Sequence, residues 1–117
     1  MGVTIDTSGS FAVAALSGEF GLIDQEGVGE RLGALVAAPE SRVAVVLKDL
    51  KQINSVGLSV LINVVTRARL NRSRVVLVAP SPFVANVLEV TALDQWFDIV
   101  DDLTAADELL QAHAPPD

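Results

Sequence analysis

Two uninterrupted apolar runs, residues 43–47 and 75–79, constrain the fold of this chain more than any other feature. Both are rich in β-branched residues and do not alternate with polar ones, which is typical of strands covered on both faces. Residues 58–70, between them, carry apolar side chains at helical spacing. The predicted inward face of this helix consists of Leu58, Leu61, Ile62, Val65 and Ala68. A strand, a helix and a second buried strand predict two parallel neighbours joined by a right-handed crossover.

The segments before this unit predict a hairpin and a helix. Residues 3–7 and 11–16 read as short strands, and the Ser-Gly-Ser turn between them indicates antiparallel pairing. Asp24 is the expected N-cap of a helix that ends near Ala38. Residues 48–52 are polar and are expected to connect the first buried strand to the helix that follows.

The segments after this unit continue the alternation. Ser81 and Pro82 predict the start of a third helix, because serine caps helices and proline favours their first turn. Residues 96–100 predict a short last strand, and Thr104 is the expected cap of a final helix. The predicted fold class is therefore α/β: one domain over residues 1–117, with a mixed sheet of four to five strands, about four helices and a frayed tail at 114–117.

Composition excludes several function classes. The chain has no cysteine and one histidine, which excludes thiolate sites and histidine clusters and leaves no catalytic set, metal site or cofactor to expect. The net charge of −7 argues against nucleic-acid binding. No signal-peptide or membrane-spanning pattern appears, so we expect a cytoplasmic binding protein without enzymatic activity and without a membrane partner.

Residues 53–58, Ile-Asn-Ser-Val-Gly-Leu, form the candidate functional motif. The backbone N–H groups of a helix start and the positive end of the helix dipole favour an anion there. Ser55 is the candidate phosphoacceptor. The alternative is that Asn54 or Ser55 simply caps the helix, since both residue types are preferred at that position.

Three segments, in this order of elements, resemble the STAS domain family, specifically its bacterial anti-sigma factor antagonists. Residues 53–58 are similar to the family's Asp-Ser-x-Gly-Leu segment at the start of its second helix. Residues 79–84, Ala-Pro-Ser-Pro-Phe-Val, resemble its Ser-Pro-x-Val helix, and residues 91–93 resemble the Thr-Gly-Leu turn after it. Residues 18–20, Gly-Glu-Phe, resemble the Gly-Glu-Leu segment that ends the second strand.

The resemblance implies a phosphorylation switch. The unmodified protein would bind an anti-sigma factor serine kinase and so free a sigma factor; the kinase would phosphorylate Ser55, and a PP2C-type phosphatase would reverse this. Asn54 and Gly21 stand where many such antagonists have aspartate, which raises the local potential but leaves the acceptor hydroxyl in place. Two other functions stay open: a STAS scaffold subunit of a larger signalling complex, and a transporter-accessory STAS protein. A homodimer or a mixed STAS oligomer is a further expectation.

The expected partner-binding residues surround Ser55. Val56, Val60 and Val64 recur every four residues on the side of the helix away from Leu58, and predict an apolar ridge that is partly exposed or else covered by the domain itself. Gly57 either lets a partner backbone approach or packs against a neighbouring strand. The full predicted set is Asn54, Val56, Gly57, Val60, Val64, Gly21 and Asp24.

Overall fold

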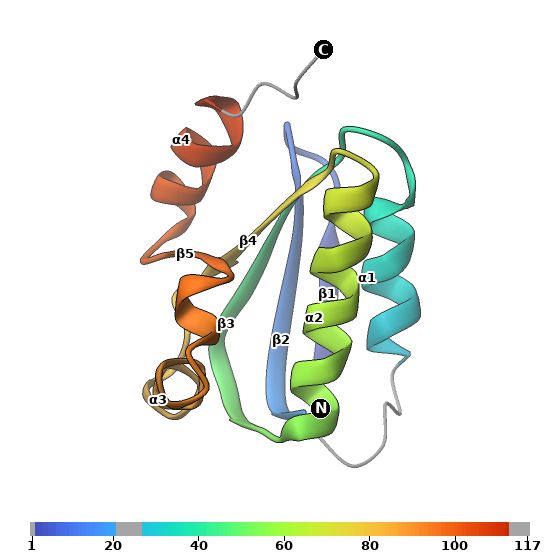
Figure 1. Cartoon of the computed structure of the whole chain (residues 1–117). Helices are drawn as coiled ribbons and strands as arrows, with labels where there is room; N and C mark the ends of the chain where they lie inside the picture. Colours follow the sequence, from blue (N-terminus) through green and yellow to red (C-terminus); the bar gives the residue numbers. More distant parts are fainter. Residues whose placement is uncertain (1, 21–26, 113–117) are drawn as a thin grey trace.

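The structure, a computed structural model, describes residues 2–20 and 27–112 (Figure 1). Five strands and four α-helices alternate along these residues. Their order is β1 (Gly2–Asp6), β2 (Ala12–Phe20), α1 (Val28–Ala37), β3 (Arg42–Ile53), α2 (Ser55–Leu70), β4 (Arg74–Val78), α3 (Pro82–Val90), the 3₁₀ turn η1 (Leu93–Gln95), β5 (Asp98–Val100) and α4 (Leu103–Ala112). The predicted α/β class and its mixed sheet are confirmed.

The strands form one sheet in the order β1-β2-β3-β4-β5. β1 pairs with β2 in antiparallel fashion, as the predicted hairpin requires, while every later pair is parallel. Because the carboxyl ends of parallel strands meet at one edge, the starts of α2 and α3 lie at the same end of the domain (Figure 1). This edge carries Ser55.

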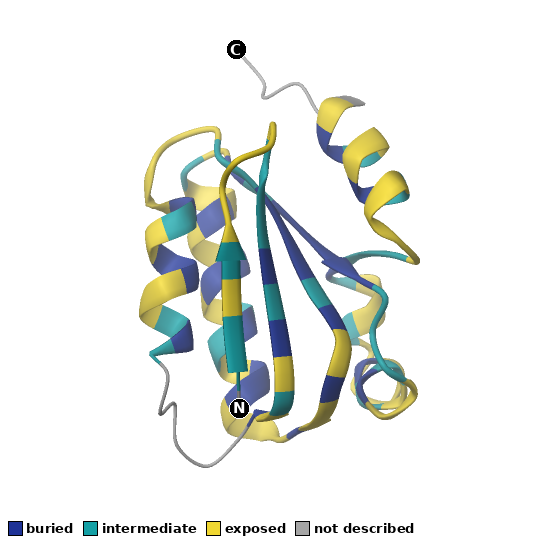
Figure 2. Cartoon of the chain, turned by 180° about the vertical axis from the view of Figure 1, so that it is seen from behind, coloured by how far each residue is buried: buried dark blue, intermediate teal, exposed yellow. Residues whose placement is uncertain are grey.

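The helices divide between the two faces of the sheet, and β3 shows the division in its side chains. Val43, Val45 and Leu47 belong to the larger apolar cluster, which also takes in the buried faces of α1, α2 and α3. Ala44 and Val46 point to the opposite face, where α4 packs in a smaller cluster. The uninterrupted apolar run of β3 is thus explained by burial on both sides (Figure 2).

The prediction that residues 48–52 form a polar connection is wrong, because β3 continues through them to Ile53. This second half of β3 pairs with a longer β2, which runs to Phe20 rather than ending at residue 16. Register shifts interrupt the pairing, and Gly18 sits at one of them with a φ of 85°. Leu50 and Ile53 are buried there, and the polar residues between them face solvent.

Two predicted helix starts also differ from the structure. The N-cap position of α1 is occupied by Gly27, and the predicted cap Asp24 lies outside the described residues. α4 begins at Leu103, and the Asp102 side chain accepts a hydrogen bond from the Ala105 backbone N–H, so Thr104 is not its cap. Among the described helices, none is both long and apolar enough to cross a membrane.

The extension of β3 can be tested by comparing two adjacent residues. Leu50→Ala removes a fully buried side chain from the main core and should lower the free energy of unfolding by about 2–5 kcal/mol. Lys51→Ala, at an exposed position of the same strand, should change it by less than about 0.5 kcal/mol. Urea unfolding of both variants measures the difference. Equal, small effects would mean that residues 48–52 are a surface connection.

Candidate functional site

Ser55 is the first residue of α2 and is exposed to solvent at the carboxyl edge of the sheet. Within the described part of the chain, no hydrogen bond engages its hydroxyl; the Ser59 hydroxyl, one turn later, donates to the Ser55 backbone carbonyl at 2.8 Å. The predicted phosphoacceptor is therefore accessible and not committed to a structural contact.

Asn54, not Ser55, caps the helix. Its side-chain oxygen accepts hydrogen bonds from the backbone N–H groups of Val56, at 3.0 Å, and Gly57, at 3.2 Å. Its backbone carbonyl also accepts from Leu58 at 2.9 Å. Two of the backbone N–H groups that were expected to favour an anion at this helix start are therefore already bound by the neutral amide of Asn54, as the capping alternative requires.

Gly57 is buried and faces its own domain. A Cβ atom at this position would lie 2.7 Å from the Phe20 carbonyl oxygen and 2.9 Å from Cγ1 of Ile53. The Asn54 backbone N–H donates to the same Phe20 carbonyl at 3.1 Å. Of the two roles considered for Gly57, the structure supports close packing against the neighbouring strand, and its burial removes it from the predicted contact surface.

The predicted ridge is exposed only near Ser55. Val56 is 43% exposed, Val60 is half-buried and Val64 is buried at 3% exposure. Each step of four residues turns about 40° beyond a full helical circle, so the row drifts around α2 until Val64 packs toward α1. Val64 is therefore a core residue: of the two alternatives considered for the ridge, cover by the domain applies at Val64 and exposure applies at Val56.

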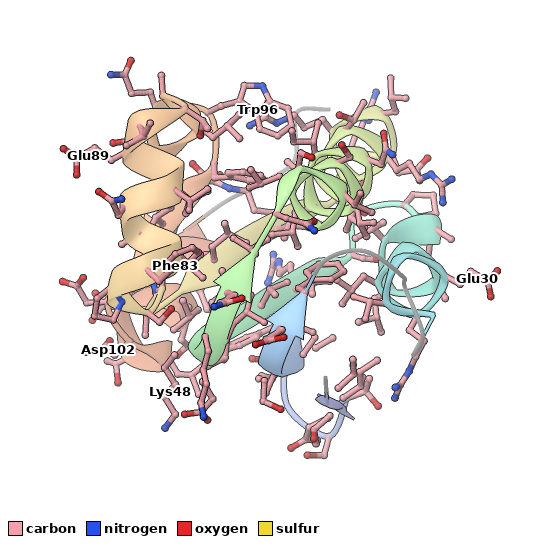
Figure 3. All side chains as sticks on the ribbon, turned by 90° about the horizontal axis from the view of Figure 1, so that it is seen from below. Glu30, Lys48, Phe83, Glu89, Trp96 and Asp102 are labelled. Carbon is pink, nitrogen blue, oxygen red and sulfur yellow. The ribbon has the colours of Figure 1, made fainter. Side chains whose placement is uncertain are left out.

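Phe83 is an exposed aromatic residue at the same end of the domain, and it was not among the residues predicted from the sequence. It is 48% exposed in the first turn of α3, and it lies beside that helix at the end of the domain seen in Figure 3. The Ser81 hydroxyl, which caps α3, donates to the Leu50 carbonyl at 2.5 Å and joins this helix to β3. The sequence could have indicated the exposure of Phe83, because this residue does not lie on the inward face of α3 that Val84 and Leu88 form.

Two predicted residues have no described position, and one perturbed carboxyl group lies away from Ser55. Gly21 and Asp24 lie outside the described residues. Among the residues that the structure describes, no cluster of His, Cys, Asp and Glu suited to a metal occurs. The pKa of Asp6 is lowered by hydrogen bonds from the hydroxyl and backbone N–H of Ser8, but this turn lies at the far edge.

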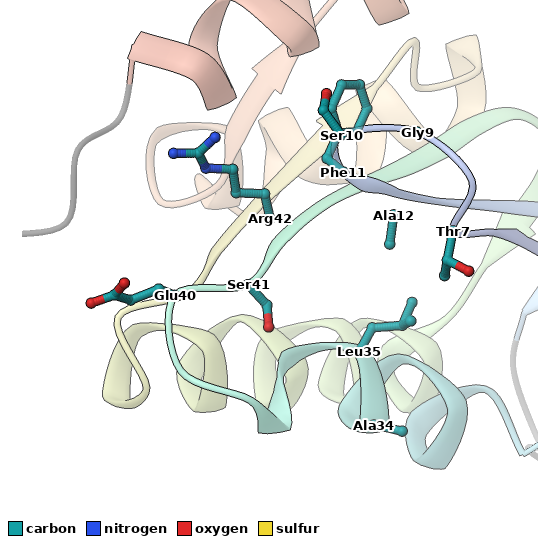
Figure 4. Close-up of a pocket in the computed structure, with 10 residues that line it drawn as sticks. All are labelled: Thr7, Gly9, Ser10, Phe11, Ala12, Ala34, Leu35, Glu40, Ser41 and Arg42. Carbon is teal, nitrogen blue, oxygen red and sulfur yellow. The ribbon is translucent and has the colours of Figure 1, made fainter.

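A hollow of about 490 Å³ also lies at that far edge, between the β1–β2 turn, the end of α1 and the start of β3 (Figure 4). Two of its polar side chains make hydrogen bonds within the domain. Arg42 donates to Gln111 of α4 at 3.3 Å, and the Ser41 hydroxyl donates to the Ala38 carbonyl at 2.7 Å. These contacts connect the start of β3 to α4 and to the end of α1.

The packing role of Gly57 predicts a contrast between two glycines. Gly57→Ala should lower stability by about 1–3 kcal/mol, because the added methyl group meets backbone that cannot move freely. Gly33→Ala meets only the flexible end of Arg67 and should raise stability by up to about 1 kcal/mol through helix propensity. Thermal or urea unfolding of both variants decides the point. A neutral Gly57→Ala would contradict the close approach.

Comparisons with known proteins agree with this geometry. The sequence matches the STAS domain over residues 3–106. A comparison with curated proteins finds no match. Among solved structures, an anti-sigma factor antagonist from Mycobacterium paratuberculosis has 21% identity and a TM-score of 0.81, with 94% of this chain and 93% of that chain covered.

Two further structures share the fold. An anti-sigma-factor antagonist (STAS) domain protein from Planctomyces limnophilus has 16% identity and a TM-score of 0.78, with 94% of this chain and 98% of that chain covered. The anti-sigma factor antagonist SpoIIAA in its unphosphorylated form has 17% identity and a TM-score of 0.76, covering 97% and 100%. The match over most of its sequence, on this sheet and helix order, shows that the chain belongs to the STAS domain family.

Proposed function

We propose that this STAS domain is a cytoplasmic, non-enzymatic regulator of the anti-sigma factor antagonist type, switched by phosphorylation of Ser55. A partner serine kinase adds the phosphate and a PP2C-type phosphatase removes it. The unmodified form binds the kinase, and the modified form does not. The observation that carries the proposal is the exposed, uncommitted hydroxyl of Ser55 at the start of α2, in the position of the family's acceptor motif.

The modification acts on the partner rather than on the fold. Phosphate adds about −1.5 to −2 charge at pH 7, and negative charge is favourable at a helix N-terminus. Ser55 is exposed, so its phosphate requires no burial. Because Asn54 already accepts from the Val56 and Gly57 N–H groups, the new charge remains at the surface unless it displaces that amide.

Because Asn54 is neutral, the unmodified helix start carries little charge, which favours a switch that acts by adding charge at Ser55. An aspartate at this cap would place a carboxylate beside the acceptor in both states, whereas asparagine is neutral. The arrival of the phosphate is then the main change in charge that a partner meets at this end of α2. Repulsion from an acidic partner rim and the bulk of the phosphate both oppose docking.

The proposed docking surface consists of the side chains that remain accessible next to the acceptor. Val56 and Val60 supply apolar area on α2, and Asn54 borders Ser55. Phe83 extends the apolar area onto α3. Exposed aromatic and aliphatic side chains of this kind are the usual anchors of protein–protein contacts.

Phosphorylation is predicted at a single serine. Incubation with the cognate kinase and Mg²⁺-ATP should add one phosphate to Ser55, and Ser55→Ala should abolish the reaction. Ser59→Ala is the matched control, because Ser59 is an exposed serine one turn further along α2. Intact-mass and peptide mass spectrometry give the stoichiometry and position. Phosphate on Ser59, or none on the wild type, would contradict the proposal.

A charge at position 55 should separate folding from partner binding. Ser55→Asp should keep the wild-type circular dichroism spectrum and melting temperature within a few degrees, yet lose the kinase in a pull-down with purified proteins. Thr66→Asp, which adds the same charge at an exposed position near the other end of α2, should retain it. Undiminished binding by Ser55→Asp would count against control of docking by this residue.

A further inference from the structure

A second surface runs along the outer side of α2. Val56, Val60, Asn63, Arg67 and Leu70 follow one another in alternating steps of four and three residues, and hence stay on one side of the helix. We call these five residues the α2 stripe. Leu70 is 80% exposed and Val56 is 43% exposed, so the stripe has accessible apolar side chains at both ends. This spacing is the pattern by which one helix packs along another.

A groove accompanies the stripe where α1 lies beside α2. It consists of two hollows of about 220 and 290 Å³, both lined by Arg67. Small residues form the α1 side, namely Gly29, Gly33 and Ala37. They leave room for side chains from another molecule to approach the helix pair, and Gly33 also gives space to the Arg67 guanidinium.

The groove contains one cation and one carboxylate that do not pair with each other. Arg67 and Glu30 both line the first hollow. Over residues 2–20 and 27–112, the one ion pair joins Arg74 to Asp98. Glu30 projects outward from α1 (Figure 3). Both charges are therefore available to an outside molecule that offers a carboxylate for Arg67 and a cation for Glu30.

We propose that this surface binds a second copy of the same chain, with the two α2 helices antiparallel and the two-fold axis next to Asn63. Val56 and Leu70 each lie seven residues from Asn63, so in this arrangement each meets the other across the interface. The amide of Asn63 both donates and accepts, which suits contact with its own counterpart. The hollow that Glu30 and Arg67 both line is also lined by Asn63, so the two-fold axis places the hollows of the two copies opposite one another. In this arrangement Arg67 of each copy is within reach of Glu30 of the other, and two equivalent ion pairs would form.

Self-complementarity favours a second copy over a different protein. An isologous interface must present the same patch on both sides. The stripe and its groove satisfy this through the apolar ends of the stripe, its central amide, and the opposite charges of Arg67 and Glu30. The contact involves only α1 and α2 of each copy. Repulsion between two chains that each carry a net charge of −7 opposes it. The contact therefore belongs to the small, weak class of interfaces and forms at high micromolar concentration.

The dimer covers Val56 and Val60, which the proposed kinase contact also uses, so self-association and partner docking would exclude one another. The inference does not require phosphorylation of Ser55, because the unmodified chain alone forms the contact. If no dimer forms, the proposed phosphorylation switch is unaffected. If Ser55 is not phosphorylated, the proposed dimer is unaffected.

Sedimentation equilibrium of the full chain, from low micromolar to millimolar concentration, tests the dimer. The average mass should rise from 12.3 kDa toward twice that value. Leu70→Asp should weaken association by about tenfold or more by placing a charge among apolar side chains. Val90→Asp, at an equally exposed valine of α3, should have no effect. A wild type that stays monomeric at millimolar concentration would overturn the proposal, as would equal behaviour of the two variants.

A charge exchange identifies the contact. Arg67→Glu and Glu30→Arg should each remain monomeric alone, because each brings like charges together across the interface. An equimolar mixture should form a heterodimer with two ion pairs: one in the wild-type sense, between the native Arg67 of one variant and the native Glu30 of the other, and one with the charges exchanged. This result also shows that both variants are folded. No association in the mixture, under conditions where the wild type dimerises, would show that Arg67 and Glu30 do not meet.

Discussion

The close approach of α2 to the end of β2 determines the position of Ser55, the proposed phosphoacceptor. Gly57 brings the first helical turn against the Phe20 carbonyl, which also accepts from the Asn54 N–H. β3 must continue to Ile53 for the chain to reach this point, and β2 must extend alongside it. The edge of the sheet, the helix start and the position of Ser55 are thus parts of one packing arrangement.

Within four consecutive residues, this arrangement separates the side chains that stabilise the fold from those to which we assign the proposed switch. Asn54 and Gly57 satisfy the backbone and the packing, whereas Ser55 and Val56 are exposed and available to other molecules. A charge added at Ser55 changes the outer surface without removing a contact that the fold needs. The exposed side of α2 then continues to Leu70, beyond the region where a phosphate on Ser55 has a direct effect.

The order of elements was predictable because, along most of the chain, the spacing of apolar residues and the residues that begin and end helices and strands indicate the same elements. The buried runs of β3 and β4 and the Ser81-Pro82 helix start are strong local signals. The second half of β3 was not predictable in this way, because a register shift breaks its alternation and its partner is distant in sequence. Tertiary packing also decided the burial of Val64 and Gly57, which depend on α1 and Phe20.

The most direct measurement compares the unmodified protein with the same chain carrying phosphoserine at position 55, introduced during synthesis so that no kinase is needed. Backbone amide NMR shifts should change in the first turn of α2, around Asn54, Val56 and Gly57, and stay constant in β4 and α4, while the purified kinase no longer binds. Shift changes spread through the sheet, a loss of folded signals, or unchanged kinase binding would contradict a switch that acts at the surface.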